Sequence, residues 1–149
     1  MVALGEKAPD FVLRDQTRAK RTLADLAGAK GMIVFMPFAF TSTCLGEMCT
    51  LCDNLHHLEA SGTKLFVITC DTLHSNRRWS EDEGFLFPIL SDFWPHGAVS
   101  QAYGCFNPAI GVPMRSTYIL DQTGLVTEIV ATERLDAPRD FADYQRALA

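Results

Sequence analysis

Three of the five cysteines lie within nine positions of one another, at Cys44, Cys49 and Cys52. A thiol can serve as a nucleophile, a redox partner or a metal ligand. Five is an odd number, and a chain of 149 residues buries enough surface to fold without disulfide bonds. In a reducing compartment such a cluster is more often catalytic, redox-active or metal-binding than structural. The sequence therefore predicts thiol chemistry near residue 44.

Cys44 follows an apolar run and a bend. Residues 32–36 predict a strand buried on both faces that ends at Pro37, and residues 43–60 have the apolar period of a helix. Cys44 then lies in the first turn, where unpaired N–H groups and the positive end of the helix dipole stabilise a thiolate. Four apolar residues share its side of the helix: Met48, Leu51, Leu55 and Leu58. Cys44 should face the sheet, although the position alone also suits an inert buried cysteine.

Short strands alternate with helices along the chain. The expected strands are residues 11–13, 32–36, 64–70 and 87–90, followed by a hairpin of 117–121 and 125–131. The expected helices are a turn at 22–26, then 43–60, 75–83 with Ser75 as N-cap, 98–103, and 138–148 with Pro138 in the first turn. This order predicts parallel pairing with an antiparallel hairpin at the edge. We expect one α/β domain over residues 1–149, a thioredoxin-like sandwich with a mixed central sheet and helices on both faces.

Charge and hydropathy exclude several classes of protein. The net charge is −5 and no basic run is present, which argues against nucleic-acid and anionic-membrane binding. The longest apolar stretch, residues 31–40, is far shorter than the roughly 20 residues that a membrane span needs. Residues 1–11 contain charged residues and lack the apolar core of a signal peptide. We therefore expect a cytoplasmic protein.

The segment Pro37-x-x-x-Thr41-x-x-Cys44 resembles the signature of the peroxiredoxins, thiol peroxidases that reduce hydroperoxides through a peroxidatic cysteine. Residues 8–13 resemble the N-terminal extension of that family, and residues 115–124 resemble the strand that carries its arginine. Residues 90–104 are similar to the AhpE-type subfamily, a mostly one-cysteine group. The resemblance covers nearly the whole chain and implies a thioredoxin-like fold with an N-terminal extension and insertions.

The resemblance also implies roles for five residues. Cys44 would attack the peroxide and become a sulfenic acid, while Thr41 would donate or relay a proton. Arg115 would hold both the thiolate and the developing oxyanion, and Pro37 would cover the pocket. Glu47 would orient the guanidinium of Arg115. From the residues alone, Glu47 is equally an acid favoured by the helix dipole, and Arg115 an arginine at a solvated strand end.

The sulfenic acid must then be resolved by a thiol. Cys49 follows Cys44 by five residues, the spacing of the resolving cysteine in PrxQ-like peroxiredoxins. On an intact helix the two Cα atoms are about 8–9 Å apart, which exceeds the roughly 7 Å limit for a disulfide. A Cys44–Cys49 bond therefore requires the first turns to unwind, which Gly46 makes easier. Projection of the helix places Cys49 on its exposed flank. The other possibility is resolution by an external thiol.

Two alternatives use Cys49 and Cys52 differently. Cys49-Thr50-Leu51-Cys52 is formally the CxxC motif of thioredoxin-like disulfide oxidoreductases, but it lies more than one turn inside the predicted helix. Cys49, Cys52 and His56, with His57 adjacent, form a stripe that would bind zinc if a fourth ligand came from elsewhere. No candidate has diagnostic spacing, so we expect neither a metal nor a cofactor. We interpret Cys70 and Cys105 as packing residues.

The expected partners follow from the resemblance. The substrate would be a hydroperoxide, and the reductant a thioredoxin- or glutaredoxin-like protein or a low-molecular-weight thiol. The family also implies a homodimer. Five residues are candidates for a substrate mouth or a dimer face: Phe38, Phe40, Phe93, Trp94 and His96.

Overall fold

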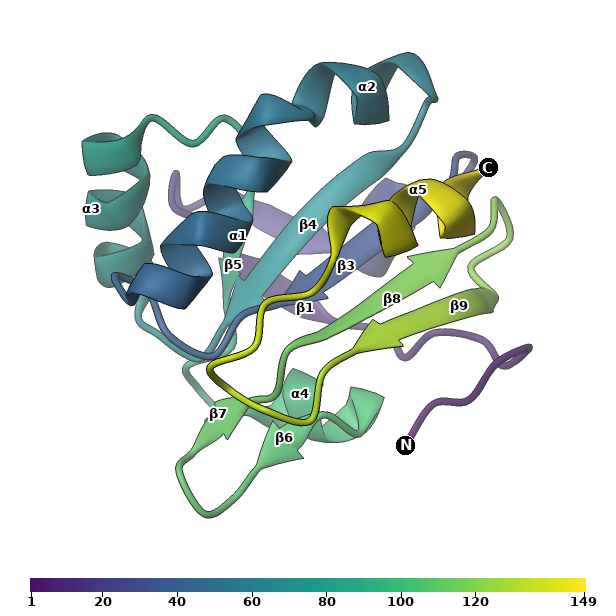
Figure 1. The fold of residues 1–149 in the computed structure, drawn as a ribbon. Helices are drawn as coiled ribbons and strands as arrows, with labels where there is room; N and C mark the ends of the chain where they lie inside the picture. Colours follow the sequence, from purple (N-terminus) through teal and green to yellow (C-terminus); the bar gives the residue numbers. More distant parts are fainter.

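A seven-stranded mixed sheet forms the centre of the protein in the computed structural model, which describes residues 1–149 (Figure 1). The strand order is β2-β1-β5-β4-β3-β8-β9. The strands are β1 (Val12–Arg14), β2 (Lys20–Thr22), β3 (Gly31–Phe35), β4 (Lys64–Thr69), β5 (Ile89–Ser91), β8 (Ser116–Leu120) and β9 (Val126–Ala131). A separate two-stranded ribbon pairs β6 (Phe106–Asn107) with β7 (Val112–Pro113).

The pairing follows the predicted pattern. The central strands β3, β4 and β5 are parallel, with Val34 opposite Val67. The hairpin of β8 and β9 joins β3 antiparallel, and β1 and β2 extend the opposite edge antiparallel. All five residues of β3 are buried, as expected of a central strand covered on both faces. The predicted α/β class and mixed sheet are confirmed.

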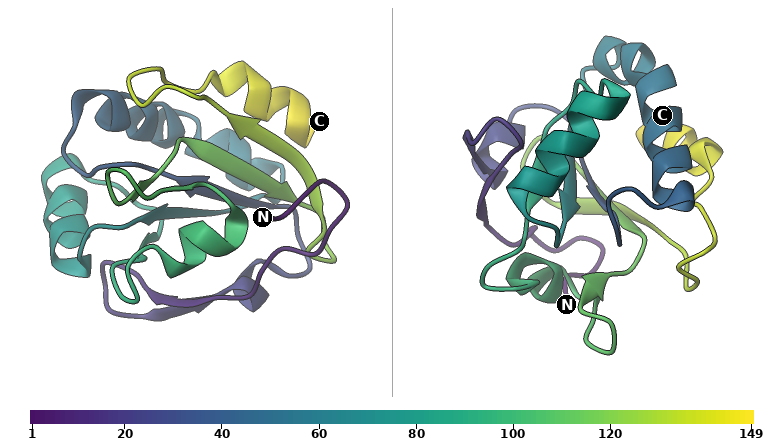
Figure 2. Two further views of the ribbon diagram at one scale, coloured as in Figure 1. Left: turned by 90° about the horizontal axis from the view of Figure 1, so that it is seen from below. Right: turned by 90° about the vertical axis from the view of Figure 1, so that its left-hand side faces the viewer.

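Helices cover both faces of the sheet (Figure 2). One face carries α1 (Ser42–Asp53), α2 (Leu55–Ala60), α3 (Leu73–Glu83) and α5 (Phe141–Leu148), and the other carries the 3₁₀ turn η1 (Leu23–Leu26) and α4 (Ala98–Tyr103). Alternate residues of β3 supply the two cores: Met32 and Val34 pack on the first face, Ile33 and Phe35 on the second. None of these helices has the length and hydrophobicity needed to span a bilayer.

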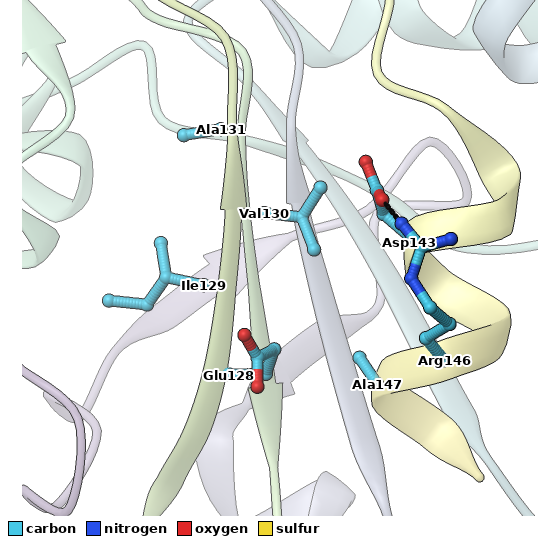
Figure 3. Close-up of a pocket in the computed structure, with 7 residues that line it drawn as sticks. All are labelled: Glu128, Ile129, Val130, Ala131, Asp143, Arg146 and Ala147. Atoms are coloured by element: carbon cyan, nitrogen blue, oxygen red, sulfur yellow. Dashed lines mark hydrogen bonds and ion pairs between the residues drawn. The ribbon is translucent and has the colours of Figure 1, made fainter.

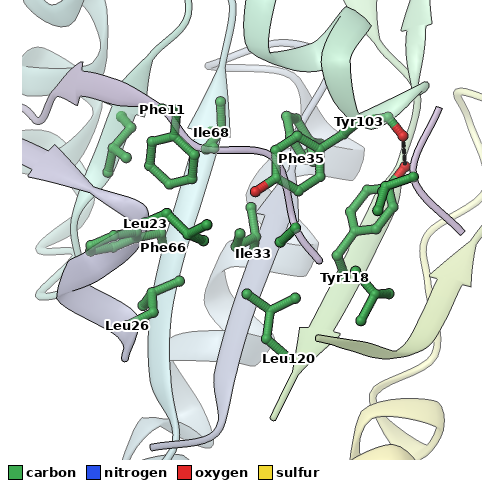
Figure 4. Packing of buried hydrophobic residues seen from close by; sticks show 14 of the residues in the cluster. Phe11, Leu23, Leu26, Ile33, Phe35, Phe66, Ile68, Tyr103, Tyr118 and Leu120 are labelled. Atoms are coloured by element: carbon green, nitrogen blue, oxygen red, sulfur yellow. Dashed lines mark hydrogen bonds between the residues drawn. The ribbon is translucent and has the colours of Figure 1, made fainter. Parts of the chain in front are cut away.

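The core under α4 is rich in aromatic rings (Figure 4). The Tyr103 ring lies 5.4 Å from that of Phe35 and 5.1 Å from that of Tyr118, between centroids. Both tyrosine hydroxyls are satisfied, because Tyr118 donates to the carbonyl of Tyr103 at 2.9 Å and Tyr103 donates to that of Pro9 at 2.8 Å. The second bond fixes the N-terminal segment to the C-terminal end of α4.

Several predicted boundaries are wrong. The expected helix 43–60 is two helices, because Asn54 leaves helical geometry and its side-chain amide donates to the carbonyl of Thr50 at 2.8 Å. The last helix begins at Phe141 with Asp140 as N-cap, so Pro138 lies outside it. The short strands β2, β6 and β7 have too few residues to show a periodic pattern.

The N-cap of α3 is Thr72, not the predicted Ser75. Its Oγ1 accepts a hydrogen bond from the Ser75 N–H at 3.2 Å. We expect Thr72→Ala to lower the free energy of unfolding by about 1 kcal/mol, because this N–H loses its partner. Urea unfolding of wild type, Thr72→Ala and Ser75→Ala measures how much each substitution lowers the free energy of unfolding. A larger loss in Ser75→Ala would restore the original assignment.

Candidate active site

Cys44 is the third residue of α1 and is completely buried, with 0 % of its surface exposed. It lies in the first turn, as the sequence predicted, and packs into the core that α1 shares with α3 and α5. Thr41 is the N-cap, and its carbonyl accepts the first helical hydrogen bond, from Leu45 N–H at 2.8 Å. Cys44 is therefore one of the first-turn residues whose backbone N–H groups have no partner within the helix.

The bend before α1 is held from strand β4 and helix α3. Pro37 is buried two residues after the end of β3, and Ala39 N–H donates to the Asp71 carboxylate at 2.9 Å. Phe40 has a positive φ of 67°, which is uncommon for a bulky residue, and its ring lies 6.1 Å from that of Trp79. These contacts fix the direction in which α1 leaves the sheet.

Glu47, one turn after Cys44, is buried and binds two arginines. Its carboxylate accepts a hydrogen bond from Arg115 Nη1. It also accepts from Arg139 Nε at 2.8 Å and from the Arg139 backbone N–H at 2.9 Å. Arg115 is fixed further by its Nε, which donates to the Leu135 carbonyl at 2.7 Å. The contact expected between Glu47 and Arg115 is present.

Arg139 was missed by the sequence analysis. Its side chain is wholly buried, and besides Glu47 it donates to the Phe35 carbonyl at 2.8 Å and to Thr117 Oγ1 at 3.2 Å. It thereby joins α1, the end of β3 and the start of β8. Arg139 lies in the irregular segment before α5 and belongs to no recognised motif, so nothing in its local sequence indicated burial.

The buried charges do not balance. Burial raises the pKa of Glu47, but hydrogen bonds and charge from Arg139, with the charge of Arg115, outweigh it and hold that pKa below its usual range. Burial disfavours the charged form of Arg139, whereas Tyr144, Glu47 and Cys44 favour it and keep its pKa raised. Two arginines face one carboxylate, which leaves one positive charge within electrostatic reach of Cys44.

The other predicted residues lie farther from the thiol. No hydrogen bond joins Thr41 or Arg115 to Cys44; the Thr41 hydroxyl is exposed and donates to the Phe38 carbonyl at 3.3 Å. Cys49 is the eighth residue of α1 and is exposed, as the helical projection predicted, while Cys52 is partly buried.

The zinc stripe requires one continuous helix, and this requirement is not met. Because α1 ends at Asp53, His56 lies on α2 and does not continue the face of Cys49 and Cys52. No group of three or more His, Cys, Asp or Glu side chains is arranged to hold a metal ion. Cys70 and Cys105 are buried, and burial raises the pKa of each thiol to about 12.

Two of the surface hollows border α5 or the segment that precedes it. One of about 380 Å³ lies between β9 and α5, where Arg146 pairs with Asp143 (Figure 3). It contains no thiol and no buried charge. A second, of about 540 Å³, is lined by Thr43, Glu47 and Arg139 among others. Only the second borders the charged cluster behind Cys44.

Comparison with known proteins places this arrangement in a family. The sequence matches the AhpC/TSA family over residues 4–129. It is 44% identical over 127 residues to alkyl hydroperoxide reductase E of Mycobacterium tuberculosis, covering 85% of this chain and 83% of that protein. It is 28% identical over 145 residues to peroxiredoxin bcp1 of Schizosaccharomyces pombe, covering 95% and 73% respectively.

Solved structures of peroxiredoxins superpose on this chain over nearly its whole length. Peroxidoxin BcpB of M. tuberculosis superposes with a TM-score of 0.85 at 25% identity, covering 99% of this chain and 95% of that one. AhpC of Enterococcus faecalis superposes with a TM-score of 0.90 at 21% identity, over 99% and 91%, and supports the fold. The thioredoxin-like architecture is confirmed, and neither the disulfide oxidoreductase nor the zinc-binding alternative is favoured. The chain belongs to the AhpC/TSA family of peroxiredoxins and is a thiol-dependent peroxidase.

Proposed function

We propose that Cys44 is the peroxidatic cysteine. Its thiolate attacks one oxygen of a hydroperoxide, so that an S–O bond forms and the O–O bond breaks. The products are Cys44 sulfenic acid and an alkoxide or hydroxide, which takes up a proton from water. The observation that carries the proposal is a net positive charge beside a cysteine in the first turn of a helix. Two arginines, Arg115 and Arg139, bind the single carboxylate of Glu47 there. This charge favours the thiolate and then the leaving oxyanion.

Four residues support this step in the proposal. Arg115 stabilises the negative charge as it moves from sulfur to oxygen, since its guanidinium is permanently charged. Glu47 fixes the orientation of Arg115. Thr41, at the helix N-cap, turns its hydroxyl toward the bound peroxide, and Pro37 limits the access of water.

Hydrogen peroxide and organic hydroperoxides are the proposed substrates. The name of the mycobacterial relative, alkyl hydroperoxide reductase E, supports the second class. Phe38 and Phe40 are partly exposed beside the bend and offer apolar contacts to an organic substituent. The electrons come from a thiol, either a thioredoxin- or glutaredoxin-like protein or a low-molecular-weight thiol.

We propose that Cys49 resolves the sulfenic acid. Its thiol displaces water from Cys44 sulfenic acid, which forms a Cys44–Cys49 disulfide. The exposure of Cys49 and the absence of any close neighbour at the Gly46 Cβ position support unwinding of this part of α1. The low helix propensity of Gly46 lowers the cost of that step by about 1 kcal/mol relative to alanine.

Two further proposals concern the setting in which the enzyme works. Phe38, Phe40, Phe93 and Trp94 are all more than a third exposed, and Trp94 is 80% exposed. Such aromatic surface supports a homodimer interface. All five cysteines are free, which supports a reducing, cytoplasmic location.

The test is the number of free thiols after one equivalent of hydrogen peroxide, quenched within seconds. We expect wild type to lose two thiols and Cys44→Ser to lose none, with Cys105→Ala as a control that removes a distant thiol. Cys49→Ser should lose one thiol to a sulfenic acid that dimedone traps. If Cys44→Ser lost thiols to hydrogen peroxide as fast as wild type, the proposal would be refuted. Loss of a single thiol in wild type, to a trappable sulfenic acid and without any disulfide, would assign resolution to an external thiol.

A further inference from the structure

Cys52 has no part in the reaction described so far, yet it lies beside the proposed resolving cysteine. Cys49 and Cys52 are the eighth and eleventh residues of the regular helix α1. Residues three apart on a helix have Cα atoms about 5 Å apart by helical rise and radius. Disulfides accept Cα separations of about 4.4–6.8 Å. A bond between these two thiols therefore needs only a local adjustment of one turn, because their Cβ atoms, about 5–6 Å apart on a regular helix, must approach to about 3.5–4.5 Å.

The same geometry disfavours the other two pairings of the three cysteines. Cys44 and Cys49 are about 8–9 Å apart and Cys44 and Cys52 about 12 Å apart on the same helix. A Cys44–Cys49 disulfide therefore exists only while the first turns of α1 are unwound, and Cys52 cannot reach Cys44 directly. Unwinding also removes Cys44 and Met48 from the core, where both are completely buried.

We propose that Cys52 accepts the disulfide from Cys44 and completes a three-cysteine relay along α1. This inference rests on the proposed function of Cys44 and Cys49. The Cys52 thiolate attacks Cys49 Sγ, the Cys49–Cys52 bond forms, the Cys44–Cys49 bond breaks, and the bonding pair leaves on Cys44 as a thiolate. The number of disulfides is unchanged, and Cys44 is returned to its reduced state.

Two features of α1 and its neighbours direct this exchange toward Cys52. Transfer lets the first turns of α1 rewind and lets Cys44 return to the core, because the Cys49–Cys52 bond distorts only the single turn between those two residues. Once the first turns have rewound, Cys44 again lies beside the cluster of Glu47, Arg115 and Arg139, whose net positive charge stabilises the product of the exchange.

The surroundings of Cys49 and Cys52 favour the same direction. Burial, with charge from Cys49 and Asp53, raises the pKa of Cys52 to about 11. Burial, with the charges of Glu83 and Asp53, also raises the pKa of Cys49. When the pKa of a thiol is raised, its reduced form gains no stability from ionisation at neutral pH. The equilibrium between dithiol and disulfide then shifts toward the disulfide. The low thiolate fraction of Cys52 slows its attack, whereas its fixed position near Cys49 accelerates it.

The relay would separate peroxide reduction from the encounter with the reductant. The Cys49–Cys52 disulfide lies on the exposed flank of α1, where Cys49 is accessible to a protein thiol. Cys44 is meanwhile free to attack a second peroxide before any reductant binds. One chain should then consume two equivalents of peroxide rapidly.

Peptide mapping of the wild-type enzyme tests the product directly. The reduced protein is treated with one equivalent of hydrogen peroxide, quenched in acid after increasing times and alkylated. Cleavage after Glu47 and Glu59 separates Cys44 from a peptide, residues 48–59, that contains Cys49 and Cys52. We expect the two peptides to be cross-linked at first. The final product should be alkylated Cys44 with an internal disulfide in 48–59. A cross-link that persists would overturn the relay.

The peroxide stoichiometry gives an independent measurement without reductant. Wild type should consume two equivalents in the fast phase, whereas Cys52→Ser and Cys52→Ala should each consume one. The control Cys105→Ala should retain two. A fast phase of one equivalent in wild type refutes the relay and leaves the proposed function intact. Absence of any fast phase that depends on Cys44 refutes the proposed function itself.

Discussion

Replacing Arg115 by methionine is expected to slow the reaction of Cys44 with hydrogen peroxide by about 10²–10³-fold, the usual effect of removing one donor that stabilises a developing oxyanion. Methionine keeps much of the volume of the buried side chain, so packing changes little. Glu47 then balances Arg139 alone, and the positive charge that favours both the thiolate and the leaving oxyanion is lost. The effect should therefore appear in the rate of the first, peroxide-consuming step.

Stopped-flow competition for hydrogen peroxide measures that rate constant for each variant. Arg115→Lys keeps the charge but loses the planar guanidinium, so we expect an intermediate rate. Arg134→Met is the matched control, because its side chain is 76% exposed and pairs only with Asp136 at the surface. Thermal unfolding shows whether each variant is folded at the assay temperature. A folded Arg115→Met enzyme that reacts as fast as wild type would exclude the proposed role.

The parts of the site that were predictable depend on local sequence. Three signals follow one another along a short stretch of sequence. They are the apolar run that becomes β3, the bend at Pro37 and the change to helical periodicity. Together they were enough to place Cys44 in the first turn of α1 and Cys49 on its exposed flank. The pairing of Glu47 with Arg115 required the family resemblance, because 68 residues separate them.

The features that were missed depend on contacts distant in sequence or on side-chain capping. Arg139 is 92 residues from Glu47, and its burial follows from packing against β3 and β8. The same contacts hold residues 138–140 out of helical geometry, which explains why Pro138 does not begin α5. Asn54 ends α1, and its side-chain amide donates a hydrogen bond to the Thr50 carbonyl. The periodicity of apolar residues gives no information about such a bond.

Glu47→Gln is expected to lower the free energy of unfolding at neutral pH by about 3–5 kcal/mol, the cost of removing one partner from a buried ion pair. Two arginine side chains, 2% and 0% exposed, would lose the one carboxylate that both of them bind. The glutamine amide would also direct N–H donors toward guanidinium donors. Thermal unfolding measures the change, at roughly 2–4 °C of midpoint per kcal/mol for a chain of this size.

The pH dependence identifies the charge as the cause. The pKa of Glu47 is lowered in the folded protein, so its ionised form contributes stability that is complete above the unfolded value of about 4.3. That stability is lost as the pH falls through the folded value. The difference in midpoint between wild type and Glu47→Gln should therefore be large at pH 7 and smaller near pH 3. Glu81→Gln is the control, because Glu81 pairs with Arg77 on the surface and its loss should change little at either pH. A difference that does not vary with pH would mean that Glu47 acts through packing, and the electrostatic account of the thiolate would lose its support.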